Sequence, residues 1–132
     1  MRDYKKLDVW KKAHEQYMFV KKNIAIKFPK EERFELTSQL LRASLSAPLN
    51  IVEGCGRFTD KDFAHFLDNS FGSTNETDYC CFAAYELKYI TEEEYNIVNK
   101  LINEARAMLI NFLKFLRNGG GDPKPYTLKP FI

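Results

Sequence analysis

The chain has 132 residues, of which 29% are charged and 45% hydrophobic, and its formal net charge at pH 7 is +2. This length fits one domain with a core of its own, without disulfides or a metal to hold it together. The composition excludes disorder over most of the chain, and so small a net charge does not mark a strong nucleic-acid binder. No apolar run approaches the roughly 20 residues of a membrane span. The charged N-terminus also lacks the apolar core of a signal peptide.

The cysteines and the distribution of charge say more than the totals. Three cysteines, with Cys80 and Cys81 adjacent, do not form a disulfide framework, so we expect a reduced, cytoplasmic protein. Residues 1–30 contain nine basic and three acidic residues, whereas residues 57–90 contain three basic and six acidic ones. The chain is therefore polarised, which favours contact between unlike surfaces.

Four helices are predicted, over about residues 8–27, 30–54, 60–89 and 91–117. Pro29 ends the first, because the residue before a proline is pushed out of the helical region. Gly54 ends the second, and Thr91 with Glu94 has the capping-box spacing at the start of the fourth. The short connections favour an all-α, antiparallel up-and-down four-helix bundle over residues 1–118.

The first helix has two apolar sides at 100° per residue. One side predicts the core and contains Trp10, Tyr17, Ile24 and Phe28, flanked by Ala13 and Val20. Phe19 and Ile26, seven residues apart, lie on the opposite side. Two interpretations stay open for this pair: scattered surface residues, or a subunit interface.

The second helix carries a polar stripe with steps of three or four residues, which places its members on one face. The stripe consists of Glu32, Glu35, Gln39, Arg42, Ser46, Asn50, Glu53 and Arg57. One interpretation is a solvent face. The other is a buried or interfacial hydrogen-bond network in which Arg42 pairs with an acid such as Glu53 or Glu76, joined by Ser73. Pro48 is expected to bend this helix, and Asn50 is placed to satisfy a carbonyl that the proline frees.

Catalytic and metal chemistry find little support. His14 and His65 lack the spacing of a di-iron bundle, and neighbouring Cys80 and Cys81 make a poor chelate. Ser73 with Glu76 has no oxyanion hole, and the glycines after residue 118 follow a helix rather than a strand. We therefore expect no catalytic residues, no cofactor and no metal.

A basic side is the one candidate for nucleic-acid contact. It consists of Lys5, Lys11, Lys12 and Lys22 near the first helix, with Lys100, Arg106, Lys114 and Arg117 on the fourth. The alternative is a solvated face. The last segment, residues 119–132, is a separate Gly/Pro-rich extended tail, for which docking on a neighbour and disorder both stay open.

Residues 39–54 carry a family resemblance. They read QLLRASLSAPLNIVEG, and this stretch resembles the pattern Q-L-R-R-A-x-x-S-x-x-x-N-I-x-E-G of the four-helix-bundle proteins encoded in 23S rRNA intervening sequences. Other matches are Leu7 to Trp10, Phe28-Pro29 with Glu32, Arg57, Phe63 to Leu67, and Gly72-Ser73 with Glu76, so the resemblance covers about residues 4–117. The chain departs from the pattern at Leu41, where arginine is common, and at Val52, where alanine is usual. The missing arginine at position 41 weakens the inference of RNA binding.

The resemblance implies a left-handed bundle and a ring-like homopentamer. One branch of the family is the accessory protein of diversity-generating retroelements, which engages a reverse transcriptase and nucleic acid. For most members no activity is established, and the older label S23 ribosomal protein reflects gene position. Three hypotheses follow: a self-associating scaffold or adaptor that touches RNA or a reverse-transcriptase-like protein, a purely structural homo-oligomer, and, as a distant third, an enzyme in an intersubunit cleft.

Overall fold

The computed structural model describes residues 2–118, and within this range the chain forms four long helices and no strand. They are α1 (Asp8–Phe19), α2 (Leu36–Cys55), α3 (Asp60–Glu86) and α4 (Glu92–Arg117). Short helical turns surround α1 and precede α2, namely η1 (Tyr4–Lys6), η2 (Val20–Ile24), η3 (Ala25–Lys27) and η4 (Lys30–Glu32). The predicted all-α class is confirmed. The predicted tail lies outside the described residues.

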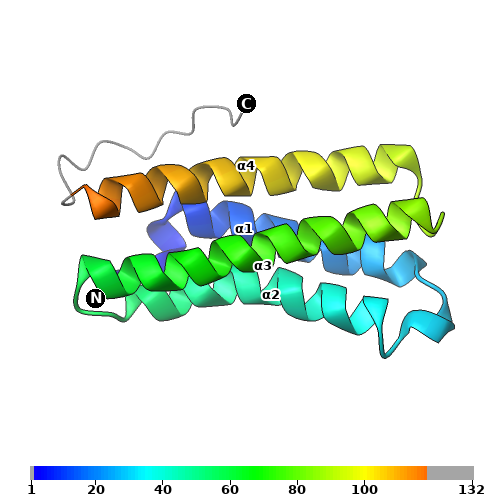
Figure 1. Ribbon diagram of the computed structural model, residues 1–132, viewed down its shortest axis with the longest axis horizontal. Helices are drawn as coiled ribbons and strands as arrows, with labels where there is room; N and C mark the ends of the chain where they lie inside the picture. Colours follow the sequence, from blue (N-terminus) through cyan, green and yellow to red (C-terminus); the bar gives the residue numbers. More distant parts are fainter. Residues whose placement is uncertain (1, 119–132) are drawn as a thin grey trace.

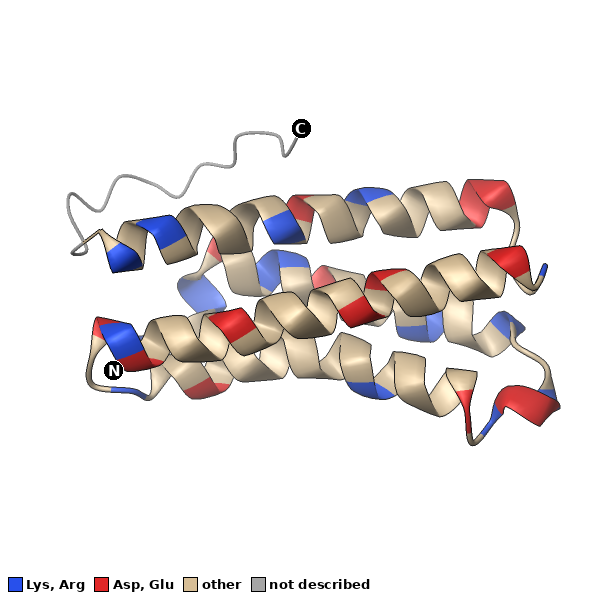
Figure 2. Ribbon diagram, viewed as in Figure 1, with Lys and Arg blue, Asp and Glu red and all other residues tan. Residues whose placement is uncertain are grey.

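The four helices form an antiparallel up-and-down bundle. Helices that follow one another in the chain pack together, and α1 closes the arrangement by packing against α4. Successive helices run in opposite directions (Figure 1), as the short connections predicted. Acidic residues gather at the end of the bundle where α2 and α4 begin (Figure 2). The left-handed sense of the bundle stays a prediction.

Two predicted helix boundaries are wrong. The second helix begins at Leu36 rather than near residue 30, because Glu35 leaves the helical region at φ −117° and ψ −100°. The Glu32 carboxylate then accepts a hydrogen bond from the Leu36 amide at 3.3 Å and caps the helix from outside. The third helix ends at Glu86 rather than 89, and Lys88 takes a left-handed φ of 64° that turns the chain toward α4.

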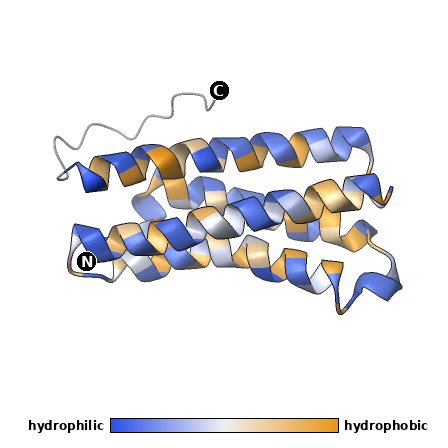
Figure 3. Cartoon of the chain, in the orientation of Figure 1, coloured by the Kyte–Doolittle hydropathy of each residue, from blue (hydrophilic) through white to orange (hydrophobic). Residues whose placement is uncertain are grey.

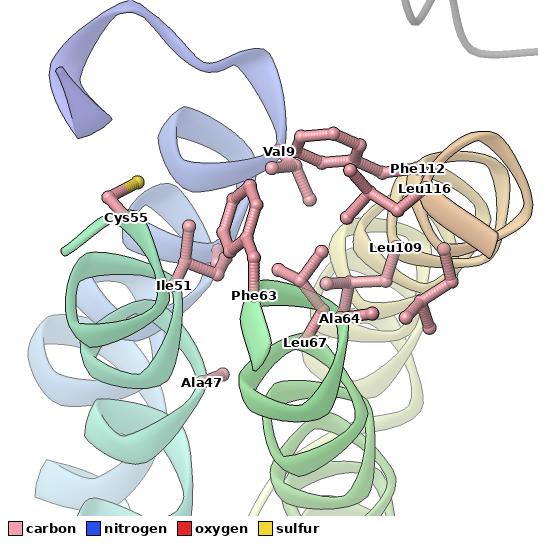
Figure 4. Close-up of a cluster of buried hydrophobic side chains, with 12 residues drawn as sticks. Val9, Ala47, Ile51, Cys55, Phe63, Ala64, Leu67, Leu109, Phe112 and Leu116 are labelled. Carbon is pink, nitrogen blue, oxygen red and sulfur yellow. The ribbon is translucent and has the colours of Figure 1, made fainter. Parts of the chain in front are cut away.

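The interior consists of two apolar clusters, one toward each end of the bundle. Hydrophobic and hydrophilic residues alternate along the helices (Figure 3), and the apolar sides meet inside. Figure 4 shows the first cluster, where Phe63 of α3 packs edge-on against Phe112 of α4 with ring centroids 5.3 Å apart. The second cluster includes Val20, Ile24 and Ile102.

A fully buried polar layer separates the two clusters. It contains Gln16, Ser44, Ser70, Thr74 and Thr77. Their hydroxyls donate to backbone carbonyls, as in the bond from Ser70 to Ala47 of 2.7 Å. The Gln16 amide has no hydrogen-bond partner among residues 2–118. The layer divides the core into two parts.

The first helix follows its predicted core side only in part. Ile24 is buried as expected, but Trp10 is half-buried and stacks on His14 at 4.9 Å. Phe19 packs, half-buried, against the second cluster, whereas Ile26 is 68% exposed. The expectation that both lie away from the core is therefore wrong for Phe19. The π-helical turn η2 lies between the two residues and shifts the helical register there.

Candidate functional site

The polar stripe of α2 lies at the seam with α3 and divides into two hydrogen-bonded groups. In the first, the Gln39 amide donates to the Glu76 carboxylate, and Arg42 donates to the Gln39 side-chain oxygen at 3.4 Å. All three side chains are exposed. Arg42 has no carboxylate within 4.0 Å among the described residues, so its predicted buried pairing with Glu53 or Glu76 is wrong within one chain.

The second group is half-buried and centred on Ser46. Ser73 of α3 donates to the Ser46 hydroxyl at 2.9 Å, and the Asn50 amide donates to the same hydroxyl and to the Ser46 carbonyl, also at 2.9 Å. The carbonyl that loses its usual donor at Pro48 is that of Ser44, four residues earlier. Asn50 therefore does not play the part that the sequence suggested. Its amide instead ties the seam together.

Four members of the stripe lie outside both groups. Glu32 and Glu35 precede α2, and Glu53 and Arg57 are exposed at its far end. Glu53 makes no ion pair within the described part of the chain. The structure thus gathers Gln39, Arg42 and Glu76 in one group and Ser46, Asn50 and Ser73 in another, but not all eight predicted residues.

Exposed leucines flank this seam. Leu45 is 43% and Leu49 is 47% exposed on the outer side of α2. Beside Ser73 on α3, Gly72 is exposed, and a Cβ there would meet no atom within 4 Å. A glycine inside a helix costs about 1 kcal/mol relative to alanine, and nothing in the described protomer requires it. We name Arg42, Leu45, Ser46, Leu49, Gly72 and Ser73 the α2–α3 face.

The better-buried arginine network lies elsewhere, between α3 and α4, and sequence reasoning missed it. Arg106 pairs with Asp78 at 2.9 Å and donates to Asn75 at 3.0 Å and to Asn103 at 2.5 Å. The Arg106 and Asp78 side chains are only 18% and 23% exposed. The spacing of Asn99, Asn103 and Arg106 by four and three residues marks one polar stripe on α4, and this signal was in the sequence.

The predicted basic side of the first helix is partly neutralised. Lys12 pairs with Glu15 at 3.1 Å and with Glu104 of α4 at 3.3 Å. Burial lowers the pKa of Lys12, but these two carboxylates outweigh it and raise the pKa overall. Lys11 lies 3.8 Å from Asp8. Lys5 and Lys22 are exposed and form no ion pair with any described residue.

The basic residues of α4 follow the same pattern. Arg106 is taken by Asp78, and Arg117 pairs with Asp68. Lys100 and Lys114 are exposed without an ion pair inside residues 2–118. The basic side therefore offers fewer free cations than the sequence count indicates.

The cysteines are buried and unpaired. Burial, with the nearby Glu76 charge, raises the pKa of Cys80 to about 11, and burial raises the pKa of Cys81 and of Cys55 as well. Such thiols stay protonated at neutral pH and are poor nucleophiles. Among residues 2–118 no group of three His, Cys, Asp or Glu side chains is placed to hold a metal ion. No helix in this range is long and apolar enough to cross a membrane.

Comparisons with known proteins agree with the residue pattern. The family model described as 23S rRNA-intervening sequence protein matches residues 5–111. A solved structure from Bacteroides thetaiotaomicron VPI-5482, of a protein with unknown function from the S23 ribosomal protein family, is 28% identical. The two structures superpose with a TM-score of 0.74, and the match covers 80% of this chain and 98% of the solved chain. No curated protein matches the chain.

Proposed function

Because the chain belongs to the family of 23S rRNA-intervening sequence proteins, we propose that it is a non-catalytic, self-associating scaffold. In this proposal the bundle associates with copies of itself, with a pentameric ring favoured by the family resemblance. The assembled scaffold contacts RNA or a nucleic-acid-processing partner such as a reverse-transcriptase-like protein in the cytoplasm. The family and the solved relative have no known enzymatic activity.

The observation that carries self-association is the α2–α3 face. Its two leucines lie on one side of α2, near the hydrogen-bonded serines, and each keeps more than two fifths of its surface exposed. Gly72 leaves room for a close approach by another helix, because no atom of the described protomer fills the space over it. Apolar side chains around small residues and fixed polar groups are typical of a helix-packing surface. Ile26 supports a second contact, since it is 68% exposed.

Light scattering on the wild-type protein and on Leu49→Glu tests the proposal. We expect the wild type to contain several protomers at micromolar concentration, and we expect Leu49→Glu to shift it toward the 15.5 kDa monomer, because a charge would be buried at the contact. Ile97→Glu is the matched control, since Ile97 is 45% exposed on α4, away from this face. A wild-type protein that stays at the monomer mass would refute self-association.

The alternative is a structural homo-oligomer without nucleic-acid binding. It is favoured by the ion pairs that occupy Lys12, Arg106 and Arg117. Lys5 and Lys22, which have no ion pair with a described residue, remain to attract phosphates, and copies of them around a ring would sum their potential. Measuring RNA binding at increasing salt distinguishes the two functions. A scaffold that contacts RNA should retain RNA at low salt and lose it steeply as the salt rises, whereas the alternative should retain none.

A further inference from the structure

Two Arg-Phe dipeptides stand at opposite ends of α2 and differ in their surroundings. Arg33-Phe34 precedes the helix and Arg57-Phe58 follows it. Both phenylalanines are almost wholly exposed, at 84% for Phe34 and 102% for Phe58. The ring of Phe58 contributes nothing to the core, and its faces are accessible to a ligand.

The two arginines use different rings. The Arg33 guanidinium lies over the ring of its neighbour Phe34, 5.1 Å from the centroid. The Arg57 guanidinium lies instead over Phe66 of α3, at 4.6 Å, and so leaves the Phe58 ring open. Arg57 has no carboxylate partner among the described residues. Stacking on Phe66 restricts the orientation of Arg57 without neutralising its charge.

A second arginine lies beside this pair. Arg2, Gly56, Arg57 and Phe58 line a hollow of about 410 Å³. Arg2 is fixed there: it pairs with Asp60 at 2.6 Å, donates to the Arg57 carbonyl at 3.3 Å and lies 4.3 Å from the centroid of the Phe63 ring. Asp60, the first residue of α3, is thus paired with Arg2.

Acidic residues lie near both dipeptides in sequence. Glu31, Glu32 and Glu35 flank Phe34, at the acidic end of the bundle that Figure 2 shows. At the other end, the last turn of α4 carries Lys114, which is exposed without an ion pair to any described residue, and Arg117, which pairs with Asp68. Glu53 and Asp62 are exposed carboxylates near Phe58 in sequence and will limit the affinity for an anion.

We propose that Arg57 and Phe58 bind one nucleotide unit, with the phosphate on the guanidinium and the base stacked on the ring. A guanidinium binds phosphate oxygens through a rigid fork of donors. An open aromatic ring stacks on the face of any base, and unstacked bases occur in single strands. A free nucleotide and a single strand of RNA share this chemistry. The inference rests on the RNA contact in the proposed function and moves it from the lysines of the first helix to the α2–α3 turn.

Fluorescence anisotropy of a labelled single-stranded RNA of about 12 nucleotides, in about 50 mM salt, tests the site. We expect Phe58→Ala to weaken binding by about fivefold or more, since a base–ring stack is lost. We expect Phe58→Trp to restore binding. Arg57→Gln should weaken it and reduce the dependence on salt. Phe58 is outside the core, so none of its variants should unfold the bundle.

Phe34→Ala and Arg33→Gln are the matched controls, and they should leave the affinity unchanged. Competition with uridine monophosphate distinguishes the two sources: a free nucleotide that displaces the strand indicates a nucleotide site, and one that does not indicates recognition of a strand. A loss of affinity at Phe34→Ala equal to that at Phe58→Ala would overturn the proposal. A change in oligomer mass in Phe58→Ala with RNA affinity unchanged would also overturn it, because Phe58 would then be a protein contact.

Replacing Lys5, Lys11, Lys12 and Lys22 by glutamate separates this inference from the proposal it rests on. If the lysine variant loses RNA and Phe58→Ala does not, the inference fails and the RNA-contacting scaffold survives. If the wild type retains no RNA, the inference and the RNA contact both fail. Self-association is then still decided by light scattering alone.

Discussion

Gly54 and Gly72 show how differently two helical glycines are held. A Cβ on Gly54 would lie 2.7 Å from Phe63 Cδ1 and 3.0 Å from Phe66 Cβ, so only glycine lets α2 approach α3 this closely. Gly72 has open space above it. The first glycine is explained by packing inside the protomer, whereas nothing in the described protomer requires the second.

Arg42 of α2 and Arg106 of α4 differ in burial and in partners, and this difference gives a prediction at the residue scale. Arg42→Ala should change the free energy of unfolding by no more than about 0.5 kcal/mol, since Arg42 is exposed and unpaired with any described acid. Arg106→Ala should lower it by about 2–4 kcal/mol, because Asp78 would keep a poorly solvated charge without its partner. Urea unfolding of dilute protein measures both. Equal effects would contradict the assignment of the network to α4.

At the scale of elements, helix ends are decided by a few residues. Thr91 and Glu94 form both bonds of the predicted capping box at the start of α4. Lys27 at the end of η3 pairs with Glu94 at 2.7 Å and so ties the end of the first helical segment to this cap. The hydrogen bond from Lys27, with those from Thr91 and the charge of Lys27, holds the pKa of Glu94 below its usual value. The end of α3 is held less well, because Lys88 adopts a left-handed φ of 64°.

Lys88→Gly should therefore stabilise the protein by about 1 kcal/mol, since a left-handed conformation costs a side chain about that much and glycine almost nothing. Lys100→Gly, the same change in the interior of α4, is the control and should destabilise by about 1 kcal/mol. Thermal or urea unfolding of the two variants should give shifts of opposite sign. A loss of stability in both would show that the Lys88 side chain has a role of its own.

At the scale of the whole molecule, the core has two apolar halves, and each half contains at least one cysteine. Cys55 belongs to the first cluster and Cys80 and Cys81 to the second, on either side of the polar layer. Water reaches the buried thiols only when the bundle opens, so the ionisation of these thiols is coupled to unfolding.

This predicts a dependence of stability on alkaline pH. The folded state raises the pKa of Cys80 from 9.0 to about 11, so it binds the thiol proton more tightly than the unfolded chain. The contribution of Cys80 is complete below pH 9 and is lost as the pH rises from about 9 to 11. Unfolding free energies at pH 8 and pH 10.5 should fall less in Cys80→Ala than in the wild type. An equal fall in the two proteins would show that the thiol is not the titrating group.

The sequence by itself determined the helices and their order. Helical periodicity, the proline after Phe28, the capping box and the short connections are local signals, so the all-α class and the up-and-down topology followed from them. The pattern in residues 39–54 was enough to indicate the family that the comparisons found. Of the candidate site, helical spacing placed the stripe on one face, and in the structure Glu76 bonds to Gln39 and Ser73 to Ser46 of that stripe.

Only the tertiary structure decided which of these side chains meet. Arg42 and Arg106 each lie in a polar stripe of a helix, but only Arg106 pairs with an acid of α3, namely Asp78. Glu76 of α3 bonds to Gln39 and not to Arg42. Phe19 turned out to face the core, in a segment where a π-helical turn shifts the register. Arg57 stacks on a ring of α3 and leaves Phe58 open. Periodicity fixes the direction of a side chain around its own helix, whereas a partner on another helix depends on the distance and rotation between the two axes, which one-dimensional spacing does not contain.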